Sequence, residues 1–76
     1  MNKKVMLITG TSQGIGHHLA VHYASNSFFV IGCSRRSSKF EDENYQHFEL
    51  DISDEKATKK MFSNIRKTYG RLDVLI

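Results

Sequence analysis

Cysteine is almost absent from this sequence, since Cys33 is the only one among 76 residues. A lone thiol excludes an intrachain disulfide and a cysteine-based zinc site. A chain of this length buries only about 60% of the surface that its unfolded form exposes, so we expect a marginal core. We expect Cys33 to be a small core hydrophobe, because a redox role would need an exposed thiol with a lowered pKa. The near absence of cysteine also favours a reducing, cytoplasmic compartment.

Long apolar runs and an excess of one charge are missing as well. No apolar run approaches the roughly 18 residues of a membrane span, and the four apolar residues after Lys4 are too few for a signal peptide. The net charge is only +3, with 11 basic and 8 acidic residues interspersed rather than gathered in a basic stripe. We therefore expect neither a membrane nor a nucleic-acid partner. The hydrophobic share of 39% is too high for a disordered chain, which leaves one small globular domain.

The sequence does contain short apolar runs that alternate with stretches of helical periodicity. Strands are expected over residues 5–8, 28–33, 45–50 and 73–76, and helices over 15–25 and 55–69. Ser53 or Asp54 is the expected N-cap of the second helix, and Gly70 is its expected stop. An order of β-α-β-β-α-β is typical of an α/β fold with a parallel sheet and right-handed crossovers.

Two rows of residues on the first helix could face the sheet. Ile15, Leu19 and Tyr23 recur at four-residue spacing and predict an apolar face. Gly16, Ala20 and Ala24 form a second row of small residues, which would let the helix lie close to the sheet. On the second helix, one face is expected to pack on the core and consists of Ala57 or Thr58, Met61, Phe62, Ile65 and Tyr69.

A glycine-rich turn joins the first strand to the first helix over residues 9–16, Thr-Gly-Thr-Ser-Gln-Gly-Ile-Gly. Glycines allow a tight turn and close approach of the backbone to a phosphate, and the helix N-terminus adds unpaired N–H groups. The spacing is G-x3-G-x-G, which is neither the common G-x-G-x-x-G fingerprint nor a P-loop, because no Lys-Ser/Thr follows. A plain strand-to-helix turn is the structural alternative to a phosphate site.

This turn resembles the Thr-Gly-x-x-x-Gly-x-Gly signature of the short-chain dehydrogenases/reductases. Asp51-Ile52 stands where that family has its adenine-contacting Asp and an apolar neighbour, and residues 70–76 resemble its approach to the fourth strand. The resemblance covers the whole chain. It implies a doubly wound, Rossmann-type parallel sheet of strand order 3-2-1-4. It also implies hydride transfer between a nicotinamide cofactor and a carbonyl or alcohol substrate, in a homo-oligomeric parent protein.

Ser34-Arg35-Arg36 follows the second expected strand, where dinucleotide folds meet the adenosine ribose. An acid there would bind the free 2′-hydroxyl of NAD(H), but the position that the family uses for this acid is Ser34. A guanidinium pairs bidentately with phosphate and a serine hydroxyl can donate to it, so we expect NADP(H) rather than NAD(H). The alternative is a solvated basic loop. The expected cofactor contacts are Gly10, Thr11, Ser12, Gln13, Gly14, Ile15, Gly16, Ser34, Arg35, Asp51 and Ile52.

No catalytic residue can be assigned by the resemblance. The family's catalytic Ser and Tyr-x-x-x-Lys pair lie in the second half of its fold, and Tyr23, Tyr45 and Tyr69 all lack a Lys four positions on. We therefore expect residues 1–76 to be an incomplete NADP-binding domain, the N-terminal cofactor-binding half of an oxidoreductase, truncated within the fourth strand and inactive alone. The alternative is a small, non-enzymatic nucleotide-binding or interaction module.

Three histidines lie close together on the first expected helix. His18 and His22 are spaced i, i+4 and could share a metal ion, but no third ligand is evident and we expect no metal site. An exposed helix face explains the pair. His17, in the first turn, could instead lie near the cofactor's pyrophosphate.

Overall fold

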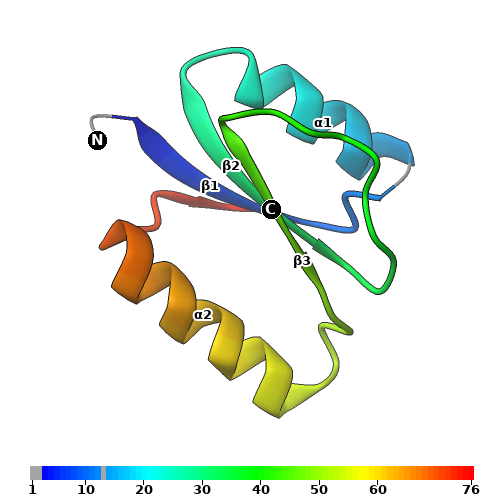
Figure 1. Cartoon of the computed structure of the whole chain (residues 1–76), viewed down its shortest axis with the longest axis vertical. Coiled ribbons are helices and arrows are strands. Elements are labelled where there is room, and N and C mark those ends of the chain that lie inside the picture. Colours follow the sequence, from blue (N-terminus) through cyan, green and yellow to red (C-terminus); the bar gives the residue numbers. More distant parts are fainter. Residues whose placement is uncertain (1–2, 13) are drawn as a thin grey trace.

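The computed structural model describes residues 3–12 and 14–76 and has the expected alternation of strands and helices (Figure 1). The elements are β1 (Lys4–Thr9), α1 (Gly14–Ala24), β2 (Phe28–Ser34), β3 (Tyr45–Glu49), α2 (Glu55–Tyr69) and β4 (Val74–Leu75). β4 is shorter than the predicted strand, although the Ile76 N–H still donates to the Leu7 carbonyl at 2.8 Å. No helix in these described ranges is long and apolar enough to cross a membrane.

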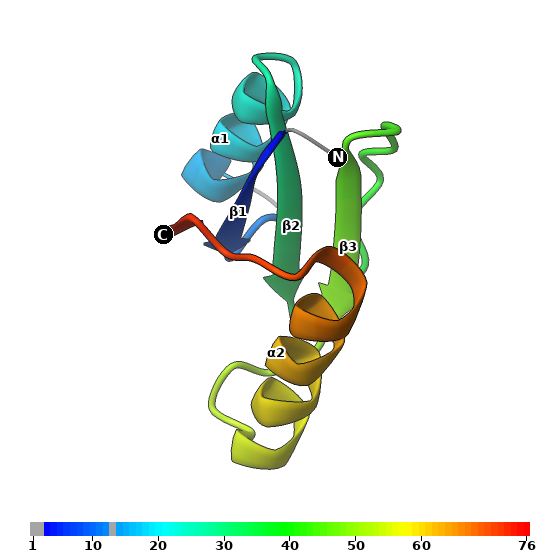
Figure 2. The ribbon, with the colours of Figure 1, turned by 90° about the vertical axis from the view of Figure 1, so that its left-hand side faces the viewer.

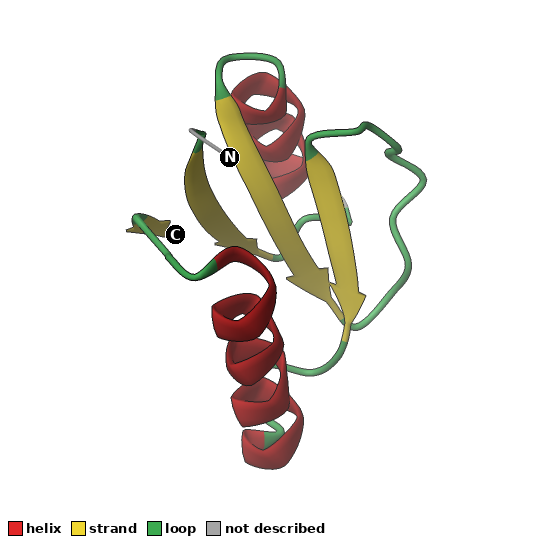
Figure 3. Ribbon diagram, turned by 60° about the vertical axis from the view of Figure 1, so that its left-hand side comes forward, coloured by secondary structure: helices red, strands yellow, loops and turns green. Residues whose placement is uncertain are grey.

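The strands form one parallel sheet in the order β3-β2-β1-β4, which confirms the predicted α/β fold and strand order. Met6 of β1 lies opposite both Val30 of β2 and Val74 of β4, and Val30 in turn lies opposite Tyr45 of β3. The arrows of β1, β2 and β3 therefore point the same way (Figure 3). Their carboxyl ends meet at one edge of the sheet.

The helices cover opposite faces of the sheet (Figure 2). Because side chains alternate along a strand, β1 and β2 contribute to both cores. One core packs Met6, Ile8 and Val30 against Ala20 and Ala24 of α1. The other packs residues of β1 and β2 against α2 and consists of Val5, Leu7, Phe29, Ile31, Cys33, Met61 and Ile65. The predicted core roles of Cys33 and of the apolar face of α2 are confirmed.

The two rows on α1 separate clearly. Ala20 and Ala24 are buried, Leu19 and Tyr23 pack at the margin of the core, and Ile15 is 79% exposed. The prediction that Ile15 begins the core-facing row was therefore wrong. The reason is steric: small side chains let the α1 backbone lie close to the sheet, so the row of alanines faces it and Ile15 projects away.

Both ends of α2 are capped as expected. The Asp54 carboxylate accepts the Ala57 N–H at 3.1 Å, so Asp54 rather than Ser53 is the N-cap. Gly70 adopts the left-handed conformation at φ 72° and donates its N–H to the Arg66 carbonyl at 3.0 Å. These caps define where the chain leaves the helix and turns back to β4.

Candidate functional site

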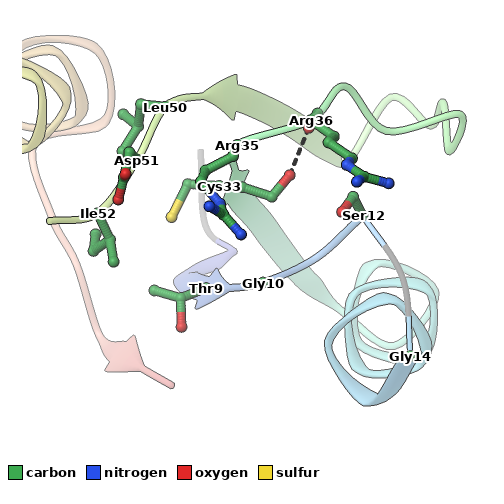
Figure 4. Close-up of a pocket in the computed structure, with 11 residues that line it drawn as sticks. Thr9, Gly10, Ser12, Gly14, Cys33, Arg35, Arg36, Leu50, Asp51 and Ile52 are labelled. Atoms are coloured by element: carbon green, nitrogen blue, oxygen red, sulfur yellow. Dashed lines mark hydrogen bonds between the residues drawn. The ribbon is translucent and has the colours of Figure 1, made fainter. Parts of the chain in front are cut away.

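A cleft of about 530 Å³ lies at the carboxyl ends of the parallel strands (Figure 4). Ligands of doubly wound folds bind at this edge of the sheet. Its walls come from the glycine-rich turn, the end of β2 and the segment after β3, and consist of Thr9, Gly10, Ser12, Gly14, Cys33, Ser34, Arg35, Arg36, Leu50, Asp51 and Ile52.

The glycine-rich turn has the backbone geometry that its sequence requires. Gly10 and Gly14 have φ values of 68° and 65°, a region that other residues rarely adopt. The Gly10 N–H donates to the Cys33 carbonyl at 2.8 Å, which ties the turn to the end of β2. The backbone of the turn therefore borders open space at the start of α1, which a phosphate site requires.

The structure brings seven of the expected contact residues to the cleft: Gly10, Ser12, Gly14, Ser34, Arg35, Asp51 and Ile52. Gln13 lies outside the described residues. Gly16 packs against the Gly10 carbonyl instead of lining the cleft, and Ile15 projects into solvent. Thr11 is completely buried, and its hydroxyl lies 3.0 Å from the Tyr45 hydroxyl. Direct cofactor contact stays a prediction for all eleven residues.

One side of the cleft is basic. The Arg35 guanidinium projects over the cleft, and that of Arg36 points toward Ser12 (Figure 4). Ser12 and Arg36 also line a second polar cavity together with His17, Ser37 and Lys39. Cationic side chains thus flank the glycine turn where an anionic group would lie.

The opposite side combines an acceptor with an apolar surface. Hydrogen bonds from the Ser53 N–H and hydroxyl, at 2.9 and 2.7 Å, lower the pKa of Asp51, and the charge of Arg35 adds to this effect. Ile52 is half exposed beside it. A carboxylate that stays ionised and an accessible aliphatic side chain suit a flat heteroaromatic ring with an amino group.

The Ser34 hydroxyl is already engaged. It donates to the Arg36 carbonyl at 2.5 Å, the bond dashed in Figure 4, and lies 3.0 Å from Nε2 of His47. A phosphate bond from Ser34 would therefore replace an existing one. His47 was missed by sequence reasoning, because an isolated histidine in a weakly alternating strand carries no signal of its contacts.

Four residues that line the cleft were also absent from the expected set: Thr9, Cys33, Arg36 and Leu50. Cys33 and Leu50 are the last residues of two predicted strands. Because the carboxyl ends of parallel strands meet at one edge, counting the last residue of each predicted strand would have found these two. Burial raises the pKa of the Cys33 thiol, so the thiol stays neutral in the wall of the cleft.

The histidines of α1 do not form a metal centre with other described residues, among which no group of three metal-ligating side chains occurs. His18 and His22 are exposed. His17 lies over the second cavity, and its Nδ1 is buried without a partner in the described part of the chain.

Comparison with known proteins gives a consistent result. Residues 4–76 match the family model described as short chain dehydrogenase. An uncharacterized oxidoreductase of Bacillus subtilis is 32% identical over 85 residues, covering all of this chain and 33% of that protein. The NADPH-dependent 1-acyldihydroxyacetone phosphate reductase of Saccharomyces cerevisiae is 32% identical over 82 residues, covering 96% of this chain and 28% of that protein.

Solved structures agree with these relatives. A short chain dehydrogenase from Leptospira borgpetersenii with bound NAD+ superposes with a TM-score of 0.87 at 28% identity, over 96% of this chain and 30% of that one. The ElxO protein with NADP bound superposes with a TM-score of 0.85 at 36% identity, over 96% of this chain and 33% of that one. The chain thus spans about a third of the length of the relatives it matches.

Proposed function

We propose that this chain, which belongs to the short-chain dehydrogenase family, forms the NADP(H)-binding segment of an oxidoreductase. In this proposal the whole enzyme transfers hydride between the cofactor and a carbonyl or alcohol substrate. The observation that carries the cofactor assignment is the pair Arg35-Arg36 just after β2, with Ser34 where NAD-binding folds place an acid.

The cleft offers a matching group for each part of the cofactor. Gly10, Ser12 and Gly14 would hold the pyrophosphate at the start of α1. The Arg35 guanidinium would pair with the 2′-phosphate of the adenosine ribose, and the adenine would lie between Asp51 and Ile52. The bound cofactor supplies or accepts the hydride, and these residues bind and orient it.

We further propose that this chain alone catalyses no turnover. The Tyr45 hydroxyl contacts Thr11 and His47, and the Tyr69 hydroxyl donates to Gln46, so both are occupied in structural contacts. Neither tyrosine has a Lys four positions on, which the resemblance requires of the proton donor. Substrate recognition, oligomer formation and a cytoplasmic location are proposals for the whole enzyme.

Nuclear magnetic resonance of the labelled chain tests this proposal. Addition of NADP+ should shift the backbone amide signals of Gly10, Ser12, Arg35 and Asp51, because these residues line one cleft. Signals of Lys60 and Asn64, on the exposed side of α2, serve as internal controls and should not move. Shifts confined to α2, or no shifts with NADP+, would contradict the proposed site.

A further inference from the structure

His47 lies at the junction of three segments. From β3, its Nε2 atom is 2.9 Å from the Arg36 carbonyl oxygen and 3.0 Å from the Ser34 hydroxyl at the end of β2. Its Nδ1 atom is 2.7 Å from the Tyr45 hydroxyl and 3.3 Å from the Thr11 hydroxyl of the glycine-rich turn. One imidazole therefore connects the glycine-rich turn, residues 34–36 and β3.

The hydrogen bonds define where the imidazole proton lies. A carbonyl oxygen only accepts, and the Ser34 hydroxyl gives its single proton to the Arg36 carbonyl. Both neighbours of Nε2 are therefore acceptors toward His47, which places a proton on Nε2. On the other side of the ring, burial raises the pKa of Tyr45, whose hydroxyl keeps its proton as a donor.

Gly32 leaves room for these contacts. It lies in the middle of the buried strand β2, where a Cβ atom would come within 2.8 Å of the Tyr45 ring and closer still to the Tyr45 and Thr11 hydroxyls. A glycine inside a strand weakens it, so this position is typical of a site where another group must approach closely. The sequence of β2 thus accommodates the hydrogen-bonded group around His47.

The Arg36 end of the segment that His47 contacts is held by these hydrogen bonds, whereas its later part is anchored by Phe40, which packs on the α1 side of the core and on Tyr45. Residues 35–44 contain no helix or strand, and both arginine side chains are exposed. The bonds of the Arg36 carbonyl to His47 and Ser34 fix the backbone from which both guanidinium groups project. Loss of these bonds would free the arginines without removing their charge.

We propose that His47 is a positioning residue for cofactor discrimination, which holds Arg35 and Arg36 where they meet the 2′-phosphate of NADP(H). The inference rests on the proposed cofactor site. His47 is not among the residues that line the cleft, and in this proposal it acts through the backbone of Arg36. Its removal should therefore weaken binding of NADPH much more than binding of NADH.

Two isosteric variants test the proposal. In His47→Gln, the side-chain amide nitrogen can occupy the place of Nε2 and still donate to the Arg36 carbonyl. In His47→Asn, the side-chain amide nitrogen reaches only the place of Nδ1. His47→Asn should lower NADPH affinity about tenfold, as expected for one lost hydrogen bond, and leave NADH affinity nearly unchanged. His47→Gln should retain the preference. The control is His22→Gln, at the far end of α1, which should change neither affinity.

Limited proteolysis of the unliganded chain gives a readout that needs no cofactor. Trypsin should cleave after Arg35 or Arg36 several times faster in His47→Asn than in the wild type or His47→Gln, while cleavage after Lys59 keeps its wild-type rate. Unchanged cleavage in His47→Asn, or equal losses of NADPH and NADH affinity, would overturn the positioning role. A wild-type chain that does not prefer NADPH would instead overturn the proposed cofactor, and the cleavage rates would still report on His47.

Discussion

Gly16 of α1 lies directly against the carbonyl group of Gly10, the residue that follows β1. A Cβ atom at Gly16 would be 2.8 Å from the Gly10 carbonyl carbon, nearer still to its oxygen, and 3.1 Å from the Thr9 carbonyl oxygen. Backbone atoms cannot move aside as a flexible side chain can. The absence of a side chain at Gly16 therefore determines how closely the start of α1 approaches β1, and with it the shape of the phosphate turn.

We expect Gly16→Val and Gly14→Val each to abolish nucleotide binding. Valine at Gly16 would push α1 off the sheet, whereas valine at Gly14 would meet a positive φ and fill the cleft. The control is Gly70→Ala, because Gly70 also has a positive φ but does not line the cleft. It should lower the free energy of unfolding by about 1 kcal/mol and leave nucleotide affinity unchanged. A thermal melt first checks that each variant is folded, and calorimetric titration of a separate sample then measures its nucleotide affinity. Full affinity in both valine variants would show that the turn is not the phosphate site.

The double variant Ser34→Asp, Arg35→Ala should reverse the cofactor preference. The new carboxylate repels a 2′-phosphate and accepts a hydrogen bond from a free 2′-hydroxyl, while the phosphate loses its guanidinium partner. NADPH affinity should fall by about tenfold or more, since a hydrogen bond to a charged group contributes about 1.5–3 kcal/mol. Arg66→Ala, an exposed change on α2, is the charge control. A double variant that still prefers NADPH would contradict the role of Arg35.

Asp73 should make the fold sensitive to acid. Hydrogen bonds from Arg71, at 2.8 and 2.7 Å, and from the Val5 N–H, at 2.8 Å, lower the pKa of Asp73 below its usual 3.8. Its contribution to stability is therefore present above pH 3.8 and is lost as the pH falls through the lower value of the folded state. Asp73→Asn should lower the urea midpoint of unfolding at pH 7. The midpoints at pH 7 and pH 3 should also differ less in this variant than in the wild type. Glu43→Gln, an exposed acid, should not. Parallel pH dependences in Asp73→Asn and the wild type would contradict this prediction.

The isolated chain should self-associate. β4 forms one edge of the sheet, and Leu75 and Ile76 beside it are 62% and 48% exposed. An apolar edge strand with unpaired backbone groups pairs readily with another chain. Size-exclusion chromatography should show species larger than a monomer, and Leu75→Lys should shift them toward the monomer. A wild-type chain that stays monomeric at high concentration would disprove this expectation.

Much of the fold could be predicted because local rules and burial agree. Val5–Ile8 and Phe28–Cys33 are continuous apolar runs, as strands covered on both faces require, and Asp54 and Gly70 mark the ends of α2. The strand order came from the resemblance, since periodicity alone does not fix which strands are neighbours. The prediction for Ile15 was wrong because it relied on the hydrophobicity of that side chain, whereas the row of small residues on α1 is the one that packs on the sheet.

The candidate site was only partly predictable. Ser34 ends β2, and Arg35 and Asp51 lie just after strands, so topology alone places them at one edge. The contacts of His47 depend on the register between β2 and β3, which puts Gly32 opposite His47, and on the space that Gly32 leaves. No local pattern in the sequence encodes that register. The hydrogen-bonded side chains around His47 can therefore be recognised only in the folded structure.

Calorimetric titration of the 76-residue chain with NADPH and with NADH, under identical salt and pH, is the decisive test of an NADP-type site in this cleft. We expect weak binding overall, because the chain spans about a third of the length of its relatives. NADPH should bind about tenfold tighter or more, through the guanidinium of Arg35. Equal affinities, or tighter binding of NADH, would refute an NADP-type site.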